Sequence, residues 1–306
     1  LELVYTSVPK GLRAGTRGFC TVAFTEGMSA NCVELAESLS GYRNVYPPQD
    51  SRYALNPPAF SHYQFIVGGE RFSVLSRVCS CAVDYSGRTN KLAHHVFVRH
   101  TEMTGAGPAW VVSQPGFFLA EWRGEPHLIK GAKRLPGGAS DNFAATAWAA
   151  RGDAGWAGVL AQSAIEATPR TAYLVFEPGF DVLALLREAL QFVPPELRWT
   201  VTFNTYFASL PQGTTCLWRC CLPDSDALRD FRRSRDALLI DLTKPLPTVT
   251  EVGELASCAR AGRMPAWPKR PSQATWAVES PTAPKAGATE TAAGPAAVAA
   301  PRGGLR

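Results

Sequence analysis

The first hundred residues contain short apolar runs rich in β-branched and aromatic side chains, a composition typical of β-strands. Gly68-Gly69-Glu70 joins two of these runs and has the sequence of a hairpin turn. Residues 92–99 are equally apolar and fit either a strand or a helix. We predict strands at residues 1–6, 18–24, 63–67 and 72–83.

Five other stretches have the apolar spacing or the composition of helices. Ser29 and Asp181 lie at the start of two of them, and the side-chain oxygens of such residues cap a helix N-terminus by accepting from its free N–H groups. Gly41 ends the first of these helices, and Pro194 ends the helix that Asp181 begins. The predicted helices are residues 28–39, 140–151, 155–167, 181–193 and 224–235.

Residues 171–242 have the most regular pattern of the chain. Apolar alternation predicts strands before and after the helix at 181–193, and the resulting order is β-α-β-β-α-β. This order permits a ferredoxin-like unit. The fold class we expect is α+β, with mixed or antiparallel sheets and packed helices. The strands predicted in this region are residues 171–177, 198–207, 214–221 and 237–242.

The composition changes near the C-terminus, where proline and alanine replace the large apolar residues. We therefore expect a globular body at 1–258, with a possible division into 1–168 and 169–245, followed by a disordered tail or linker at 259–306. A linker of this kind leads us to expect a membrane helix or another domain beyond Arg306. The chain itself has no apolar run long enough to span a membrane.

The net charge of +5 belongs to the tail. Residues 259–306 hold seven of the 31 basic side chains and two of the 26 acidic ones, so the charge of residues 1–258 sums to zero. A nucleic-acid-binding fold carries its positive excess on the folded part, and we therefore expect the body not to bind nucleic acid in general. A local basic patch is still compatible with this balance.

Several chemistries lack their sequence signature. The chain has no Gly-x-x-x-x-Gly-Lys-Ser/Thr and no His-Glu-x-x-His, so it is not itself a P-loop GTPase, and we expect no cofactor and no metal. The eight cysteines include Cys79-x-Cys81 and Cys216-x-x-x-Cys220-Cys221, which are not standard zinc knuckles. We interpret most of them as thiols of the core.

The densest polar group of the chain is the stretch from Asp84 to His95. Asp84 can orient the imidazole of His94 as a base or ligand, which makes a hydrolase using this pair one hypothesis. The alternative is structural, because Asp and Asn form turns, glycine supplies a positive φ and Arg88 can pair with Asp84. The candidate binding residues are Asp84, Ser86, Gly87, Arg88, Asn90 and His94, together with Thr6, Ser7 and Lys10 of the opening loop.

A second candidate is the loop that begins at Lys133 and runs into the helix predicted from residue 140. Backbone amides at a helix start can hold a phosphate or carboxylate, so an anion or nucleotide sensor is another hypothesis. The alternative is a loop whose Ser140 or Asp141 simply caps the helix. The candidate anion-binding residues are Lys133, Arg134, Gly137, Gly138 and Ser140.

Three blocks of sequence carry a resemblance to a known family. The opening 5–12 (YTSVPKGL) with 18–23 (GFCTVA), the stretch 84–90 (DYSGRTN) with His94, and 199–206 (WTVTFNTY) resemble the N-terminal domain (type 2) of bacterial GTPase-associated protein 1. The family's middle and C-terminal regions are not recognisable in the sequence, and we infer that the domain is reused in another architecture.

The resemblance implies a function without catalysis. Members of the family are thought to act as non-enzymatic partners of a small GTPase in bacterial conflict or signalling systems. The preferred hypothesis is therefore a cytoplasmic α+β adaptor that recognises a protein, possibly a small GTPase. The loop 84–95 and the opening loop 6–12 would shape its binding or structural centre.

Overall fold

The computed structural model describes residues 1–138, 142–234 and 236–267. The predicted helix caps Ser140 and Asp141 lie outside the described residues, as does the predicted tail from residue 268 onward. Across the described residues, no helix is both long enough and apolar enough to cross a membrane.

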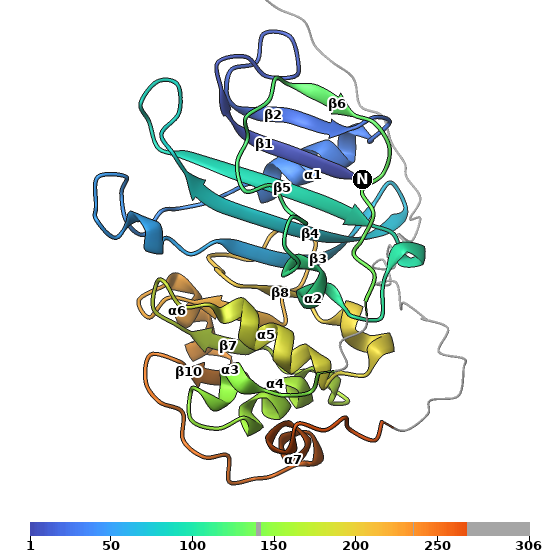
Figure 1. The fold of residues 1–306 in the computed structure, drawn as a ribbon, viewed down its shortest axis with the longest axis vertical. Coiled ribbons are helices and arrows are strands. Elements are labelled where there is room, and N and C mark those ends of the chain that lie inside the picture. The colour runs from blue at the N-terminus through green and yellow to red at the C-terminus, as the bar shows by residue number, and fades with distance from the viewer. Residues whose placement is uncertain (139–141, 235, 268–306) are drawn as a thin grey trace, which may run out of the picture. The chain divides into compact units, whose positions relative to one another are not determined.

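The strands of the described residues belong to one mixed sheet of ten strands, in the order β10-β7-β9-β8-β3-β4-β5-β1-β2-β6 (Figure 1). With helices packed on this sheet, the predicted α+β class is confirmed. The strands are β1 (Glu2–Val8), β2 (Gly18–Thr25), β3 (Ala59–Val67), β4 (Glu70–Cys81), β5 (Asn90–Val98), β6 (His127–Ile129), β7 (Ala172–Val175), β8 (Phe203–Asn204), β9 (Trp218–Cys221) and β10 (Leu238–Asp241).

The helices cover both faces of the sheet. They are α1 (Ala30–Leu39), α2 (Pro108–Val112), α3 (Thr146–Ala149), α4 (Gly155–Ile165), α5 (Val182–Gln191), α6 (Asp226–Arg233) and α7 (Glu254–Ala261). Short 3-10 turns occur at Tyr53–Leu55, His100–Glu102 and Pro195–Thr200.

The N-terminal half contains long antiparallel strands. β3, β4, β5, β1 and β2 pair in that order, and Gly68 and Gly69 turn β3 into β4 with positive φ angles of 60° and 83°. The predicted hairpin is confirmed, and residues 92–99, which fit either element, form the strand β5. Ser29 caps α1 by accepting from the amide of Cys32, as predicted.

The C-terminal half has short parallel strands. β10, β7, β9 and β8 pair in parallel, so the predicted ferredoxin-like pairing is wrong, because that unit needs antiparallel neighbours at its edges. The predicted strand 198–207 is also wrong for most of its length, since Pro195–Thr200 is a 3-10 turn and only Phe203–Asn204 pairs. With so short a strand, residues 205–217 become a long connection, which parallel neighbours require.

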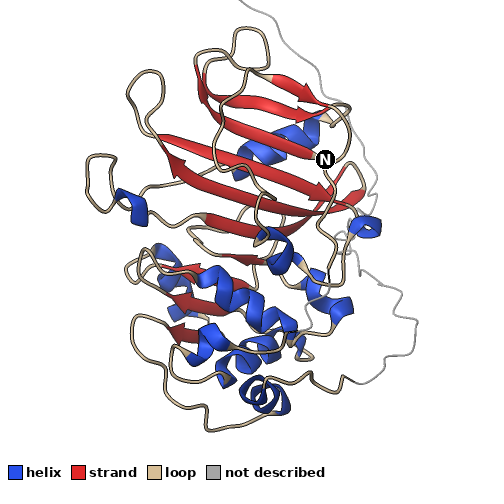
Figure 2. Ribbon diagram, viewed as in Figure 1, coloured by secondary structure: helices blue, strands red, loops and turns tan. Residues whose placement is uncertain are grey.

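Alternation along the parallel strands separates two cores. Ala172 and Leu174 of β7 face a core with α2, α3, α4 and α5, whereas Tyr173 and Val175 face a core with α1 and α6. In Figure 2, α3, α4, α5 and α6 lie around the short strands, whereas α1 lies beside the long antiparallel strands. Asp181 caps α5 by accepting from the amide of Ala184, as predicted.

Helix α7 packs directly on α4. Gly158 of α4 lies so close to α7 that a Cβ atom there would come within 2.3 Å of the backbone of Leu255 and Ala256. Asp153 also fixes this contact, since its carboxylate accepts from Arg260 of α7 and from the amide of Val249. The helix crosses residue 258 and ends at Ala261, and the compact unit extends to Trp267.

We expect Gly158→Ala to destabilise the protein, although alanine favours a helix over glycine. The added methyl group meets backbone rather than a movable side chain, so α7 must shift, and the free energy of unfolding should fall by about 1–3 kcal/mol. Urea unfolding measures this change. Gly105→Ala is the control, because a Cβ atom added there would have no neighbouring atom within 4 Å. Equal stability of the two variants would contradict the close packing.

Candidate functional site

The Asp84–Asn90 loop is held by the carboxylate of Asp84, whose side chain has no exposed surface. Oδ1 accepts from the amide of Ser86 at 2.8 Å, from its hydroxyl at 2.7 Å and from the amide of Arg88 at 3.0 Å. Oδ2 accepts from the hydroxyl of Ser7 at 2.8 Å. Gly87 supplies the positive φ of 78° that closes the turn.

Asn90 makes the second link between this loop and β1. Its Oδ1 accepts from the amide of Ser7 at 3.1 Å and from the hydroxyl of Thr6 at 3.2 Å. The structure thus brings together Thr6, Ser7, Asp84 and Asn90, which come from separate blocks of the sequence. Lys10 and Arg88 are exposed, and Arg88 reaches Asp84 only at 3.4 Å.

The hydrogen bonds received by Asp84, that of the Ser86 hydroxyl first, hold the pKa of this carboxyl well below its usual range although burial opposes them. Both oxygens of the ionised carboxylate accept hydrogen bonds, from residues of the loop and from Ser7 of β1. The role that these contacts give Asp84 is therefore structural: its carboxylate holds the Asp84–Asn90 loop against β1.

His94 does not share this network. Its Nδ1 accepts from the amide of Leu119 at 3.0 Å, so Nε2 carries the proton and donates to Glu2 at 2.9 Å. Both ring nitrogens are engaged away from Asp84, and the pair that the hydrolase hypothesis needs is not formed. Burial lowers the pKa of His94, against the effect of Glu2.

Glu2, His94 and Lys133 form a partly buried polar cluster that the sequence did not indicate. Burial raises the pKa of Glu2, but the hydrogen bond from His94 and the charge of Lys133 outweigh it and bring the pKa to about 2. Lys133 lies 3.2 Å from Glu2. The partners are more than ninety residues apart in the sequence, so no local pattern could have found them.

The predicted anion loop has other contacts. Lys133 is paired with Glu2, and Gly138 lies so close to the ring of Trp110 that a Cβ atom there would come within 2.6 Å. The helix predicted from residue 140 begins instead at Thr146, so its predicted start is wrong. The amides of Ala147 and Trp148 at that helix start already donate to Glu188, which takes the place that an external anion would need.

A groove begins beside the Asp84–Asn90 loop. One hollow of about 390 Å³ is lined by Phe19, Asn90 and Lys91, and a larger one of about 970 Å³ continues from it. The two share the lining residues 42–45, and we call them together the strand-end groove. Asn90 is therefore a predicted binding residue that lines this groove.

The larger hollow lies at the carboxyl ends of the parallel strands. Glu177 follows β7, Asp224 follows β9 and Tyr206 follows β8, and all three line it. The chain leaves β7 through α5 toward β8 and leaves β9 through α6 toward β10, so neighbouring strands diverge here. Ligands of open α/β sheets bind at such a switch point.

The cysteines and the potential metal-binding side chains are the remaining reactive groups of residues 1–138, 142–234 and 236–267. No three His, Cys, Asp or Glu side chains come together there as a possible metal site. The eight cysteines are free, and six of them are buried. Burial raises the pKa of Cys216 to about 12 and that of Cys221 to about 11, which keeps both as thiols at neutral pH.

We expect Asp84→Asn to lower the melting temperature and to change its pH dependence. Because the folded pKa lies below the unfolded value of about 3.9, the charge of Asp84 stabilises the fold above that value and this contribution is lost as the pH falls further. The variant should therefore lose less stability than the natural protein below about pH 4. Thermal unfolding between neutral and acid pH measures this, with exposed Glu34→Gln as control; parallel curves for Asp84→Asn and the natural protein would refute it.

Comparison with known families identifies two regions of the chain. Residues 1–133 match the GTPase-associated protein 1 N-terminal domain type 2, and residues 145–244 match the GTPase-associated protein 1 middle domain. The expectation that the middle region is missing was wrong. Searches among curated proteins and among solved structures found no match. The two matched regions cover about three quarters of the chain and confirm the resemblance of its opening, so the chain belongs to the GTPase-associated protein 1 family.

Proposed function

We propose that this chain is a non-enzymatic adaptor that binds a GTPase-linked protein through the strand-end groove. It would act in the cytoplasm, within a bacterial conflict or signalling system, and it would recognise protein rather than nucleic acid. Membership of a GTPase-associated family supports an accessory role with a protein partner. The strand-end groove supplies the surface to which this partner would bind.

The observation that carries the proposal is the exposure of large apolar side chains around one end of the sheet. Phe19 is 44% exposed, Val83 51% and Tyr85 53%. Phe19 lines the strand-end groove and pairs in register with Ser7, which binds Asp84, so Val83 and Tyr85 lie on the loop beside it. Exposed large apolar residues gathered in this way are typical of protein-binding surfaces.

The polar loop beneath these residues supplies rigidity. The hydrogen bonds of Asp84 and Asn90 fix residues 82–90 to β1, so Val83 and Tyr85 are presented on a preorganised backbone. Lys91 lies 5.0 Å from the ring centre of Phe19 and 5.8 Å from that of Tyr5, which holds this aromatic pair at the rim of the groove. A preorganised surface loses less entropy when it binds.

We expect Phe19→Ala and Tyr85→Ala each to weaken binding of the partner about tenfold or more, since buried aromatic anchors dominate protein interfaces. The natural chain would capture GTPase-domain proteins from its native cells, identified by mass spectrometry. The dissociation constant of the captured GTPase would then be measured for each variant.

Leu239→Ala is the matched control, because Leu239 is 40% exposed but lies on β10, at the far edge of the sheet. It should leave the affinity unchanged. Two results would overturn the proposal: capture of no GTPase-domain protein, or equal weakening by Leu239→Ala and Phe19→Ala.

A further inference from the structure

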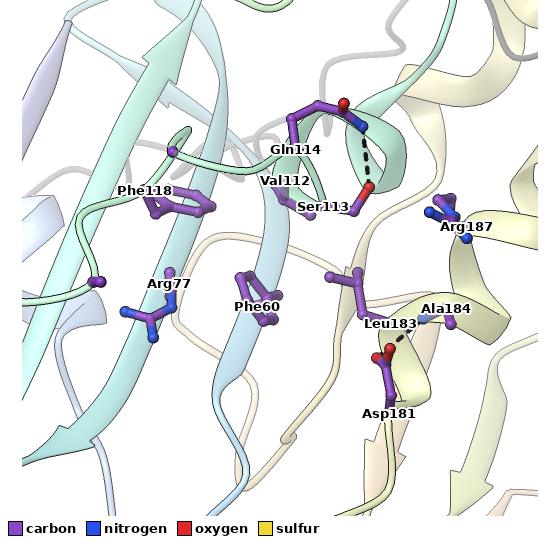
Figure 3. Close-up of a pocket in the computed structure, with 12 residues that line it drawn as sticks. Phe60, Arg77, Val112, Ser113, Gln114, Phe118, Asp181, Leu183, Ala184 and Arg187 are labelled. Atoms are coloured by element: carbon purple, nitrogen blue, oxygen red, sulfur yellow. Dashed lines mark hydrogen bonds between the residues drawn. The ribbon is translucent and has the colours of Figure 1, made fainter.

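A separate hollow of about 400 Å³ opens where the two family-matched regions meet, and we call it the seam cavity. The sheet contributes Phe60 and Arg77, and α5 contributes Leu183 and Arg187. The segment 112–120 closes a third side. In Figure 3, Phe60 and Leu183 lie between the two arginines.

The seam cavity lies on the opposite face of the sheet from the strand-end groove. Along β3, Phe60 lines the cavity, whereas its neighbours Ala59 and Ser61 line the groove. Along β4, Arg77 lines the cavity and its neighbour Val78 lines the groove. Successive residues of a strand point to opposite faces, so the two hollows are independent surfaces.

The charges of the seam cavity are unbalanced. Arg77 donates to the carbonyl oxygen of Leu119 at 2.9 Å, and Arg187 makes no hydrogen bond or ion pair within the described part of the chain. Neither guanidinium has a carboxylate partner there. Asp181 is the acidic residue of the lining, and its Oδ1 is occupied by the amide of Ala184. Two cationic groups therefore face one anionic group.

We infer that the seam cavity binds an acidic segment of a partner protein, with carboxylates on both sides of one apolar side chain. The two arginines match the carboxylates, because guanidinium groups bind carboxylates in paired hydrogen bonds. Phe60 and Leu183 offer an apolar floor between them. A compact anion such as phosphate would leave this apolar floor uncovered.

The inference goes beyond the proposed function, since the seam cavity and the strand-end groove share no lining residue. Binding at the seam is therefore testable even if no GTPase binds at the groove. Phe19→Ala should leave binding at the seam unchanged.

The test is fluorescence polarisation with a labelled peptide of sequence Glu-Glu-Leu-Glu-Glu. We expect the full chain to bind it, with an affinity that falls as salt is added. Arg77→Gln and Arg187→Gln should each weaken binding at least about fivefold. Arg71→Gln is the matched control, because Arg71 also lies on β4 but is exposed outside the cavity.

Asp181→Asn should change the affinity for the peptide in the opposite direction to the arginine variants. Asparagine caps a helix about as well as aspartate, so α5 should persist while the acidic charge of the lining is removed. The acidic peptide should then bind more tightly. Circular dichroism and thermal unfolding of each variant establish that the fold is retained.

Four results would overturn the inference. One is that the peptide fails to bind, and another is that a Gln-Gln-Leu-Gln-Gln peptide binds equally well. The third is that Arg187→Gln behaves like Arg71→Gln. Full displacement of the peptide by inorganic pyrophosphate at an equal concentration would also overturn it, because the site would then recognise charge without the apolar side chain.

Discussion

The two halves of the sheet depend on one short junction between β3 and β8. Only Ser61–Asn204 and His62–Phe203 pair there, yet the junction joins the antiparallel strands to the parallel ones. Thr205 extends it, since its amide donates to the carbonyl of Phe60 and its hydroxyl accepts from the amide of Phe60. Without these bonds, the matched N-terminal and middle regions would present two open sheet edges.

His62 lies at the centre of this junction and has no exposed surface. Its Nδ1 lies 2.8 Å from the carbonyl oxygen of Val201, so this nitrogen carries the proton, and its Nε2 accepts from the hydroxyl of Ser73. Burial lowers the pKa of His62 to about 4, which keeps the imidazole neutral. A neutral histidine that makes these two hydrogen bonds links β3 to β4 and to the segment before β8 without burying a charge.

The junction also creates both candidate surfaces. β3 pairs with β4 of the antiparallel half on one side and with β8 of the parallel half on the other, so residues of both halves meet over each of its faces. On one face α5 approaches Phe60 and Arg77 and leaves the seam cavity; on the other the ends of β7 and β9 approach Ser61 and leave the strand-end groove. Any change in the junction would therefore alter both hollows together.

Local sequence signals predicted the local parts of this fold well. Ser29 and Asp181 cap their helices, and Gly68-Gly69 forms the hairpin, because each acts on residues within four positions. The alternation in 198–207 predicts one strand, but the backbone makes a 3-10 turn up to Thr200, and tertiary packing rather than strand pairing buries Trp199 and Val201. The parallel pairing and the Glu2–His94 bond depend on residues distant in sequence, which periodicity cannot reveal.

The same distinction applies to the candidate site. The density of polar residues at 84–90 correctly marked a structured loop, but Asp, Ser, Gly and Asn in such spacing bond mainly to one another. The surfaces that remain available are the exposed apolar residues beside the loop and the arginines of the seam cavity. A charge sum of zero over residues 1–258 conceals Arg77 and Arg187, because the field at a cavity depends on the few groups that line it. The placement of charge is thus more informative here than its total.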